Sequence, residues 1–81
     1  MALEDFLSAE DKRVALELLR NRTFSELYTL CIRMNIDPDT FEYETWQAPE
    51  RTQENDAIYI NYGMIQRMCE SLKIIDLKIG K

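Results

Sequence analysis

A helical seam in the last third of the chain constrains the fold more than any other feature of the sequence. Its members recur at intervals of four, three, four and three residues: Ile58, Tyr62, Ile65, Cys69 and Leu72. This spacing puts all of their side chains on one face of an α-helix. Met64 and Met68 widen that face. We therefore predict a helix over 58–73 that buries its apolar face.

The residues around this seam leave alternatives open. The stretch 57–60 has the composition of a short strand, in which case Asn61 would cap a shorter helix. Gly63 favours the shorter helix, because a glycine inside a helix costs about 1 kcal/mol relative to alanine. Beyond the seam, apolar and charged residues alternate from residue 75 to residue 79, which is the period of a strand. A brief strand near 74–79 is therefore predicted.

Two capping signals predict two more helices in the first half of the chain. Ser8 is followed by two acidic residues, a pattern that favours a helix start, and we expect this helix over 9–21. Thr23 and Glu26 have the spacing of a capping box, in which each side chain accepts a hydrogen bond from the backbone amide of the other residue. They predict a second helix over 24–35, joined to the first helix in a tight hairpin.

The stretch after this hairpin can be interpreted in two ways. Asn35 tolerates the left-handed conformation that ends helices, so the second helix should end there. Asp37, as a cap with Pro38 at the first helical position, predicts a third short helix through residue 46. Aromatic and acidic residues alternate over 41–46, however, and this pattern predicts a strand. We favour the helix here and keep the strand as the alternative.

These elements predict a mainly α-helical fold, a single small domain over 1–81. It contains three to four helices, a helical hairpin plus a C-terminal helix, with one or two short strands near 41–46 and 74–79 as the variant. A chain of 81 residues buries only about 60–65% of its unfolded surface, so a second copy or a partner can add stability. Four large apolar residues on the predicted helix faces should form the core: Leu18, Leu27, Ile65 and Leu72.

Charge and residue usage exclude several classes of protein. The net charge of −5 and the absence of any long basic run argue against binding to a phosphate backbone. No apolar stretch approaches the ~20 residues that span a bilayer, so no membrane insertion is expected. Cys31 and Cys69 lie far apart without the spacing of a disulfide framework or a zinc site. We expect a cytoplasmic protein with neither metal nor cofactor.

Catalysis is not expected either. The chain has no histidine, so nucleophilic arrangements that use histidine as the base are excluded within one chain. Paired acids can perform acid–base chemistry only in a cleft that shifts their pKa values, and a chain of this length leaves little room for one. We expect these carboxylates to face water, and we predict no catalytic residues.

The negative charge is concentrated in one stretch, residues 37–56, which we call the acidic segment. It holds seven acids and one base, a net charge of −6, while the rest of the chain nets +1. An acidic surface with aromatic residues among its carboxylates suits contact with a basic partner. We predict partner-binding residues at its start: Asp37, Asp39, Phe41, Glu42, Tyr43, Glu44 and Trp46. The alternative is that these aromatic residues belong to the core.

The sequence thus predicts a small acidic regulatory protein that binds another protein with a basic surface. Compact acidic chains of this kind are common among accessory regulators, including viral, phage-type modulators. One alternative is a helix-turn-helix DNA-binding regulator that begins at Thr23–Glu26 and reads DNA with residues 62–72. Another is an acidic mimic of nucleic acid that inhibits a nucleic-acid-binding protein.

A homodimer is a further prediction for the seam at 58–72. Its apolar face could pack against a second copy of the chain, through Ile58, Tyr62, Ile65, Cys69 and Leu72. The alternative is that the same face packs within its own domain, which is the more common use of such a seam.

Overall fold

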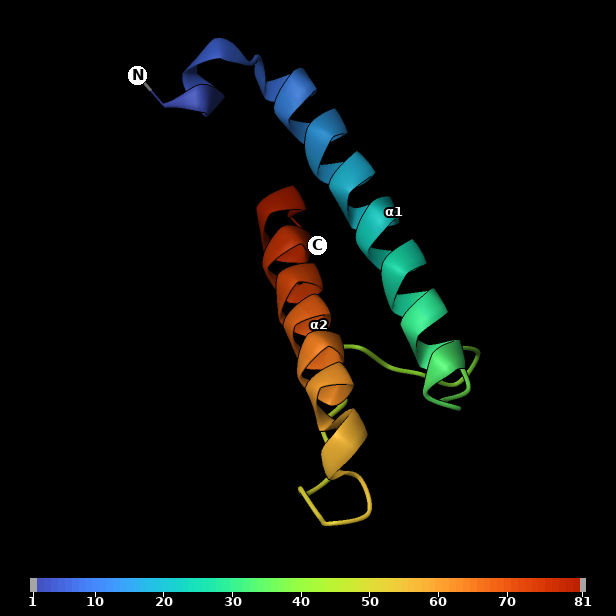
Figure 1. Cartoon of the computed structure of the whole chain (residues 1–81). Coiled ribbons are helices and arrows are strands. Elements are labelled where there is room, and N and C mark those ends of the chain that lie inside the picture. The colour runs from blue at the N-terminus through green and yellow to red at the C-terminus, as the bar shows by residue number, and fades with distance from the viewer. Residues whose placement is uncertain (1, 81) are drawn as a thin grey trace.

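Two long helices form the protein, in a computed structural model that describes residues 2–80, the side chain of Glu4 excepted. In chain order the elements are η1 (Leu3–Phe6), α1 (Ala9–Arg33), η2 (Asp56–Ile58) and α2 (Tyr59–Ile79), where η marks short 3₁₀-helices. The two α-helices run antiparallel as a hairpin-like pair (Figure 1). The mainly α-helical class is confirmed. The number of helices, predicted as three to four, is wrong, and residues 2–80 contain no strand.

The first helix begins where the sequence predicts. The Ser8 hydroxyl accepts a hydrogen bond from the Asp11 amide at 3.1 Å, which satisfies one free donor of the first turn. The predicted break between residues 21 and 24 is wrong, because α1 continues through it to Arg33. The Thr23 hydroxyl donates to the Leu19 carbonyl oxygen at 2.8 Å and so does not act as a cap. No glycine or proline interrupts this stretch, and a continuous helix leaves fewer backbone groups unsatisfied than two helix ends would.

The end of α1 follows the sequence prediction. Asn35 has a φ of 57°, in the left-handed region that terminates helices. The Ile36 amide then donates to the Cys31 carbonyl oxygen at 2.9 Å, and the Ile36 side chain packs against the core. The chain therefore turns sharply away from the helix axis at this point, which sets the direction of the acidic segment.

The second helix is the longer of the two alternatives for this region. Residues 57–60 belong to η2 and the start of α2, so the short strand there is not formed. The predicted strand at 74–79 is also wrong, because α2 continues to Ile79. The physical reason is that Ile75 is buried and Asp76 contacts Arg20 of α1, so this stretch faces α1 at helical spacing. Gly80, at a φ of 90°, ends the helix.

The core lies between the two helices. It is formed by seven buried residues: Leu27, Leu30, Cys31, Ile65, Cys69, Leu72 and Ile75. Three of the four predicted core residues are confirmed, but Leu18 is wrong, with 64% of its surface exposed. Leu18 lies nine residues before Leu27, and at about 100° per residue this places it on the opposite side of α1.

The seam at 58–72 packs within its own chain. Ile65, Cys69 and Leu72 have no exposed surface, because they pack against α1. Their burial matches the alternative that the seam forms the core of its own domain. These three side chains are therefore not available to a second copy. Ile58 is 43% exposed and Tyr62 is half-buried, so a homodimer that uses this end of the seam stays a prediction.

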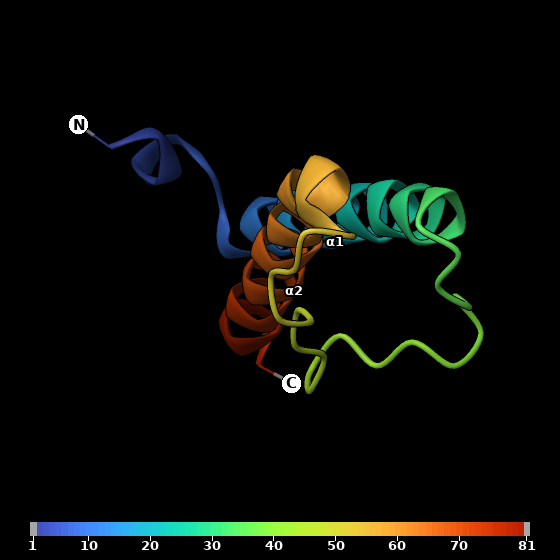
Figure 2. The same cartoon turned by 60° about the horizontal axis from the view of Figure 1, so that its bottom comes forward.

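The acidic segment lies within the connection between the end of α1 and the start of α2, which are at the same end of the antiparallel pair (Figure 1). Residues 34–55 leave the end of α1, cross one face of the hairpin and return to the start of α2 (Figures 1 and 2). The opposite face of the hairpin is not crossed by this segment (Figure 2). Among residues 2–80, neither helix is long and apolar enough to cross a membrane.

Candidate protein-binding site

The start of the acidic segment is built from two tight turns. The Asp37 carboxylate accepts a hydrogen bond from the Asp39 amide at 2.9 Å, and the Asp37 carbonyl oxygen accepts one from the Thr40 amide at 3.3 Å. In the second turn the Trp46 amide donates to the Glu42 carbonyl oxygen at 3.0 Å. The helix and the strand predicted for 37–46 are therefore both wrong. Successive turns let the aromatic side chains reach the two helices, which a regular element at this place would not.

The three aromatic residues of this stretch attach it to the helix pair. The ring of Tyr43 meets the ring of Phe24 on α1 edge to face, with centroids 5.3 Å apart. Trp46 packs against Phe41 at 5.7 Å and against Tyr62 of α2 at 6.4 Å. Each is half-buried against the core. These aromatic residues pack against the core without being part of it, and their role in binding a partner stays a prediction.

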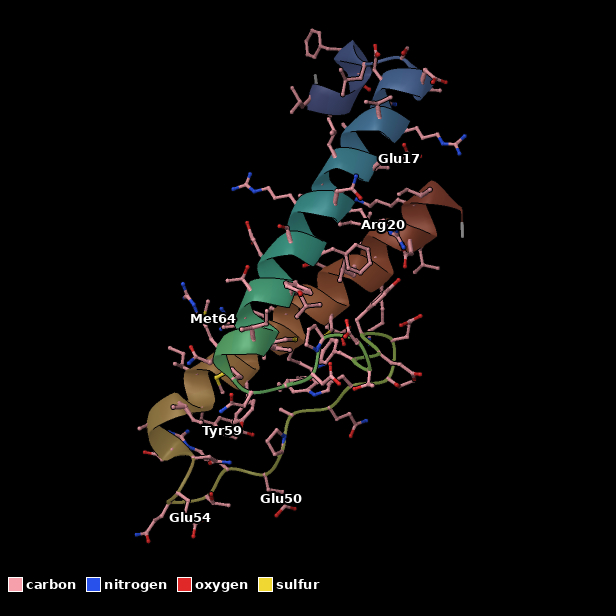
Figure 3. The ribbon with its side chains drawn as sticks, turned by 90° about the vertical axis from the view of Figure 1, so that its right-hand side faces the viewer. Glu17, Arg20, Glu50, Glu54, Tyr59 and Met64 are labelled. Atoms are coloured by element: carbon pink, nitrogen blue, oxygen red, sulfur yellow. The ribbon has the colours of Figure 1, made fainter. Side chains whose placement is uncertain are left out.

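A polar cluster joins the same stretch to both helices. Arg20 of α1 donates from Nε to the Asp76 carboxylate of α2 at 2.6 Å, and it points from α1 toward α2 in Figure 3. The Tyr43 hydroxyl donates to the other oxygen of the same carboxylate. The Arg20 guanidinium also lies 4.7 Å from the centroid of the Phe24 ring, in a cation–π contact. We call Arg20, Tyr43 and Asp76 the clamp.

The clamp raises the pKa values of two of its members. The hydrogen bond to Asp76, followed by partial burial, raises the pKa of the Tyr43 hydroxyl. The same carboxylate raises the pKa of the Arg20 guanidinium, so this residue stays charged. A neutral tyrosine and a charged arginine are the forms that the clamp requires.

Between this stretch and α1 lies a small apolar pocket. Its volume is about 160 Å³. The α1 side contributes Phe24, Leu27, Tyr28 and Cys31, and the acidic segment contributes Pro38, Phe41 and Tyr43. Tyr28 is 54% exposed, so one wall of the pocket is open to solvent. A pocket of this kind suits one apolar side chain of a partner.

Four acidic residues are adjacent in sequence to the residues of this stretch that line the pocket: Asp37, Asp39, Glu42 and Glu44. All four are exposed, and within residues 2–80 none of them forms an ion pair. Asp56, at the far end of the acidic segment, differs in this respect because it pairs with Arg51 at 2.6 Å. The stretch next to the pocket therefore carries negative charge that no neighbouring base neutralises.

The structure divides the seven predicted site residues into two groups. The acids face solvent, while Phe41 and Tyr43 line the pocket and Trp46 packs against Phe41. The sequence prediction missed the contribution of α1. Phe24, Tyr28 and Cys31 recur at helical spacing, and this signal was visible, but nothing local indicated that Pro38 would fold back onto them.

Neither a group of possible metal ligands nor a similarity to known proteins points to a function for this chain. Among residues 2–80, no three Cys, Asp or Glu side chains come together as a group that could hold a metal ion. No protein-family model, no curated protein and no solved structure matches this chain.

Proposed function

We propose that this chain is a small cytoplasmic protein without enzymatic activity that regulates a protein partner by binding it. The partner presents a basic surface with one apolar side chain at its centre. The apolar side chain enters the pocket between α1 and the acidic segment, and the basic groups meet the carboxylates around it. The observation that carries this proposal is the combination, in one place, of an open apolar pocket and four unpaired carboxylates.

Each part of this surface has a separate physical role. Carboxylates at the rim steer a basic partner toward the site and raise the association rate, but exposed ion pairs add little affinity. A side chain buried in an apolar pocket supplies most of the binding energy of a typical contact. The predicted role of the acids is therefore kept, and the predicted anchoring role of Trp46 moves to the pocket.

The predicted alternatives differ in how well the fold suits them. A helix-turn-helix regulator needs a turn at Thr23–Glu26, and α1 passes through these residues without a break. The acidic mimic of nucleic acid remains compatible with the proposal, because its target would also present a basic groove. It differs in that carboxylates alone, without the pocket, would then account for binding.

A short synthetic peptide with lysines on both sides of a single leucine tests the proposal. In a nuclear magnetic resonance titration we expect this peptide to shift the backbone signals of residues 37–46 and of Tyr28. The same peptide with serine in place of leucine should bind at least about tenfold more weakly, because nothing enters the pocket. Equal binding of the two peptides would favour the acidic mimic instead.

Two matched double variants separate the site from the overall charge. Glu42→Lys with Glu44→Lys reverses charge beside the pocket, whereas Glu50→Lys with Glu54→Lys makes the same net change at the far end of the acidic segment, where Figure 3 shows these residues. We expect the first pair to abolish the leucine dependence and the second pair to weaken binding only slightly. If both pairs act equally, binding is set by net charge alone and the proposed site is wrong.

A further inference from the structure

The face of the hairpin opposite the acidic segment carries an open apolar groove. Two adjoining hollows, of about 330 Å³ and 310 Å³, lie between α1 and α2 and share Glu26, Met64 and Met68 in their walls. Leu19 and Ile75 complete the apolar lining at one end of the groove, and Leu30 completes it at the other. Of the described residues, none between 34 and 55 lines it. Figure 3 shows Met64 on the side of the helices away from the acidic segment.

The charge of this groove is opposite to the charge of the acidic segment. Arg33 lies at one end of the groove, and Arg67 lies on α2 between Met64 and Met68, near its middle. Within residues 2–80 neither arginine forms an ion pair, whereas Glu26, the one acid of the groove, is already paired with Arg22 at 3.2 Å. An apolar groove with two unpaired arginines along it suits a segment that combines apolar and acidic residues.

The chain itself contains such a segment, residues 2–8, which we call the leading segment. It reads Ala-Leu-Glu-Asp-Phe-Leu-Ser, with two acids, three large apolar residues and no base. Leu3 is 81% exposed and Phe6 is 68% exposed, and neither packs against the core. Figures 1 and 2 show the segment projecting from the start of α1, away from the helix pair.

The solvent-exposed area of the chain is also larger than the area that is typical of a folded monomer of the same mass. The chain exposes 6345 Å², and a folded monomer of 9.6 kDa exposes about 5,100 Å². The excess of roughly 1,200 Å² exceeds the ~800 Å² that one partner contributes to an interface of standard size. The groove and the leading segment both contribute exposed apolar side chains to this excess, among them Leu3, Phe6, Leu19 and Met64.

We propose that the chain forms a homodimer in which the two copies exchange their leading segments. Leu3, Phe6 and Leu7 of each copy lie in the groove of the other copy, against Met64 and Met68, and the acids of the segment face Arg33 and Arg67. Reciprocal exchange closes the assembly with twofold symmetry and buries both grooves at once. This surface shares no residue with the pocket at the acidic segment, so either proposal can fail without the other.

Analytical ultracentrifugation of the full chain is the first test. At roughly 100 µM we expect a mass close to twice 9.6 kDa. Phe6→Ser should raise the dissociation constant of the dimer by about tenfold or more, because the ring loses its site in the groove. Arg67→Glu should weaken the dimer as well, through repulsion of the acidic leading segment. The control is Leu77→Ser, since Leu77 is 75% exposed on α2 but does not line the groove.

A spin label shows which copy provides the segment. Cys31 and Cys69 are both buried, so an Ala2→Cys variant can be labelled selectively at residue 2, which keeps Leu3, Phe6 and Leu7 intact. Labelled protein is mixed with unlabelled protein that carries isotope-enriched methionine methyl groups. We expect broadening of the Met64 and Met68 signals in the mixture, because the label then acts from the other copy.

Three results would overturn the exchange. One is a monomer at the highest concentration, and another is a dimer that Phe6→Ser and Leu77→Ser weaken equally. The third is broadening that occurs only when label and enriched methionine are on the same chain, which would mean that the segment folds back onto its own groove. Circular dichroism of Phe6→Ser should match the parent, because Phe6 has no contact with the core.

Discussion

Asp76 is the residue on which the arrangement of the acidic segment depends most. Its carboxylate accepts hydrogen bonds from Arg20 of α1 and from Tyr43 of the acidic segment, while its own backbone belongs to α2. One side chain thereby connects three parts of the chain that are far apart in sequence. The clamp is partly buried, so its hydrogen bonds are worth more than those of an exposed ion pair.

Removal of the Tyr43 hydroxyl measures this contribution. Tyr43→Phe keeps the ring against Phe24 and deletes only the donor to Asp76, so we expect the free energy of unfolding to fall by about 1–2 kcal/mol. Urea unfolding followed by circular dichroism gives this value. Tyr59→Phe is the matched control, because the Tyr59 hydroxyl donates to the Pro49 carbonyl oxygen at an exposed site. Equal losses in the two variants would mean that the hydrogen bond from Tyr43 to Asp76 stabilises the fold no more than an exposed hydrogen bond does.

The buried thiol of Cys69 predicts a pH dependence of stability. Burial raises the pKa of Cys69 from its ordinary value of 9.0 to about 11. In the unfolded chain the thiol ionises near its ordinary pKa, whereas in the folded chain it stays protonated. Its contribution is therefore fully present below pH 9 and is lost as the pH rises toward 11.

Thermal unfolding between pH 8 and pH 11 checks this expectation. We expect the melting temperature of the parent to fall across this range and that of Cys69→Ala to fall less steeply, starting from a lower value because of the lost side-chain volume. Tyr43 contributes in the same direction, since its pKa is also raised. Parallel pH profiles for the two proteins would show that Cys69 does not titrate differently in the folded and unfolded states.

At the scale of elements, two outcomes were possible for α1. Either a new helix begins at the capping signal of Thr23, or one helix continues through it. Thr23 and Glu26 have the spacing of a capping box, but Thr23 lies inside the helix and bonds back to Leu19. Glu26 pairs with Arg22 one turn earlier. Both side chains therefore satisfy partners within a continuous helix, and only Ser8 acts as a true cap.

A pair of alanine variants distinguishes a cap from a helix interior. Ser8→Ala removes the acceptor for the Asp11 amide and should destabilise the protein by about 0.5–2 kcal/mol. Thr23→Ala should be nearly neutral, because alanine has the higher helix propensity and no cap is lost. Chemical denaturation of the two variants gives the comparison. A larger loss for Thr23→Ala would indicate two helices with a cap at residue 23.

The whole molecule is elongated and incompletely packed. Its radius of gyration is 15.3 Å, against about 12 Å for a compact domain of this length. Seven buried residues between two helices form a narrow core, and many large apolar side chains stay exposed on the outer faces. A molecule of this shape gains stability when a partner or a second copy covers those faces.

Alanine at Leu18 and at Leu27 tests where this core ends. Leu27 is buried between the helices, so Leu27→Ala should lower the free energy of unfolding by about 2–5 kcal/mol. Leu18→Ala should change it by no more than about 0.5 kcal/mol, because the side chain already faces solvent. Melting curves at low protein concentration give both values without a contribution from association. Similar losses at the two positions would contradict this expectation. They would mean that Leu18 is buried in solution by contacts that residues 2–80 of a single chain do not make.

Patterns with a fixed period were predictable from the sequence, and contacts between distant residues were not. The seam predicted a buried helix face, since its intervals repeat the turn of a helix, and Ser8 and Asn35 marked the true ends of α1. The predictions failed where two local patterns competed, as at Thr23 and over 74–79, because packing against the other helix decided between them.

The sequence by itself therefore determined the helical class, most of the core and the position of the acidic segment. Only the tertiary structure decided that Phe41, Tyr43 and Trp46 lie against the helices and leave their acidic neighbours in solvent. The physical reason is that the clamp, the pocket and the groove each bring together residues at least about thirty positions apart or from different elements. Such pairings follow from burial of the helix faces in three dimensions, and no spacing along the chain encodes them.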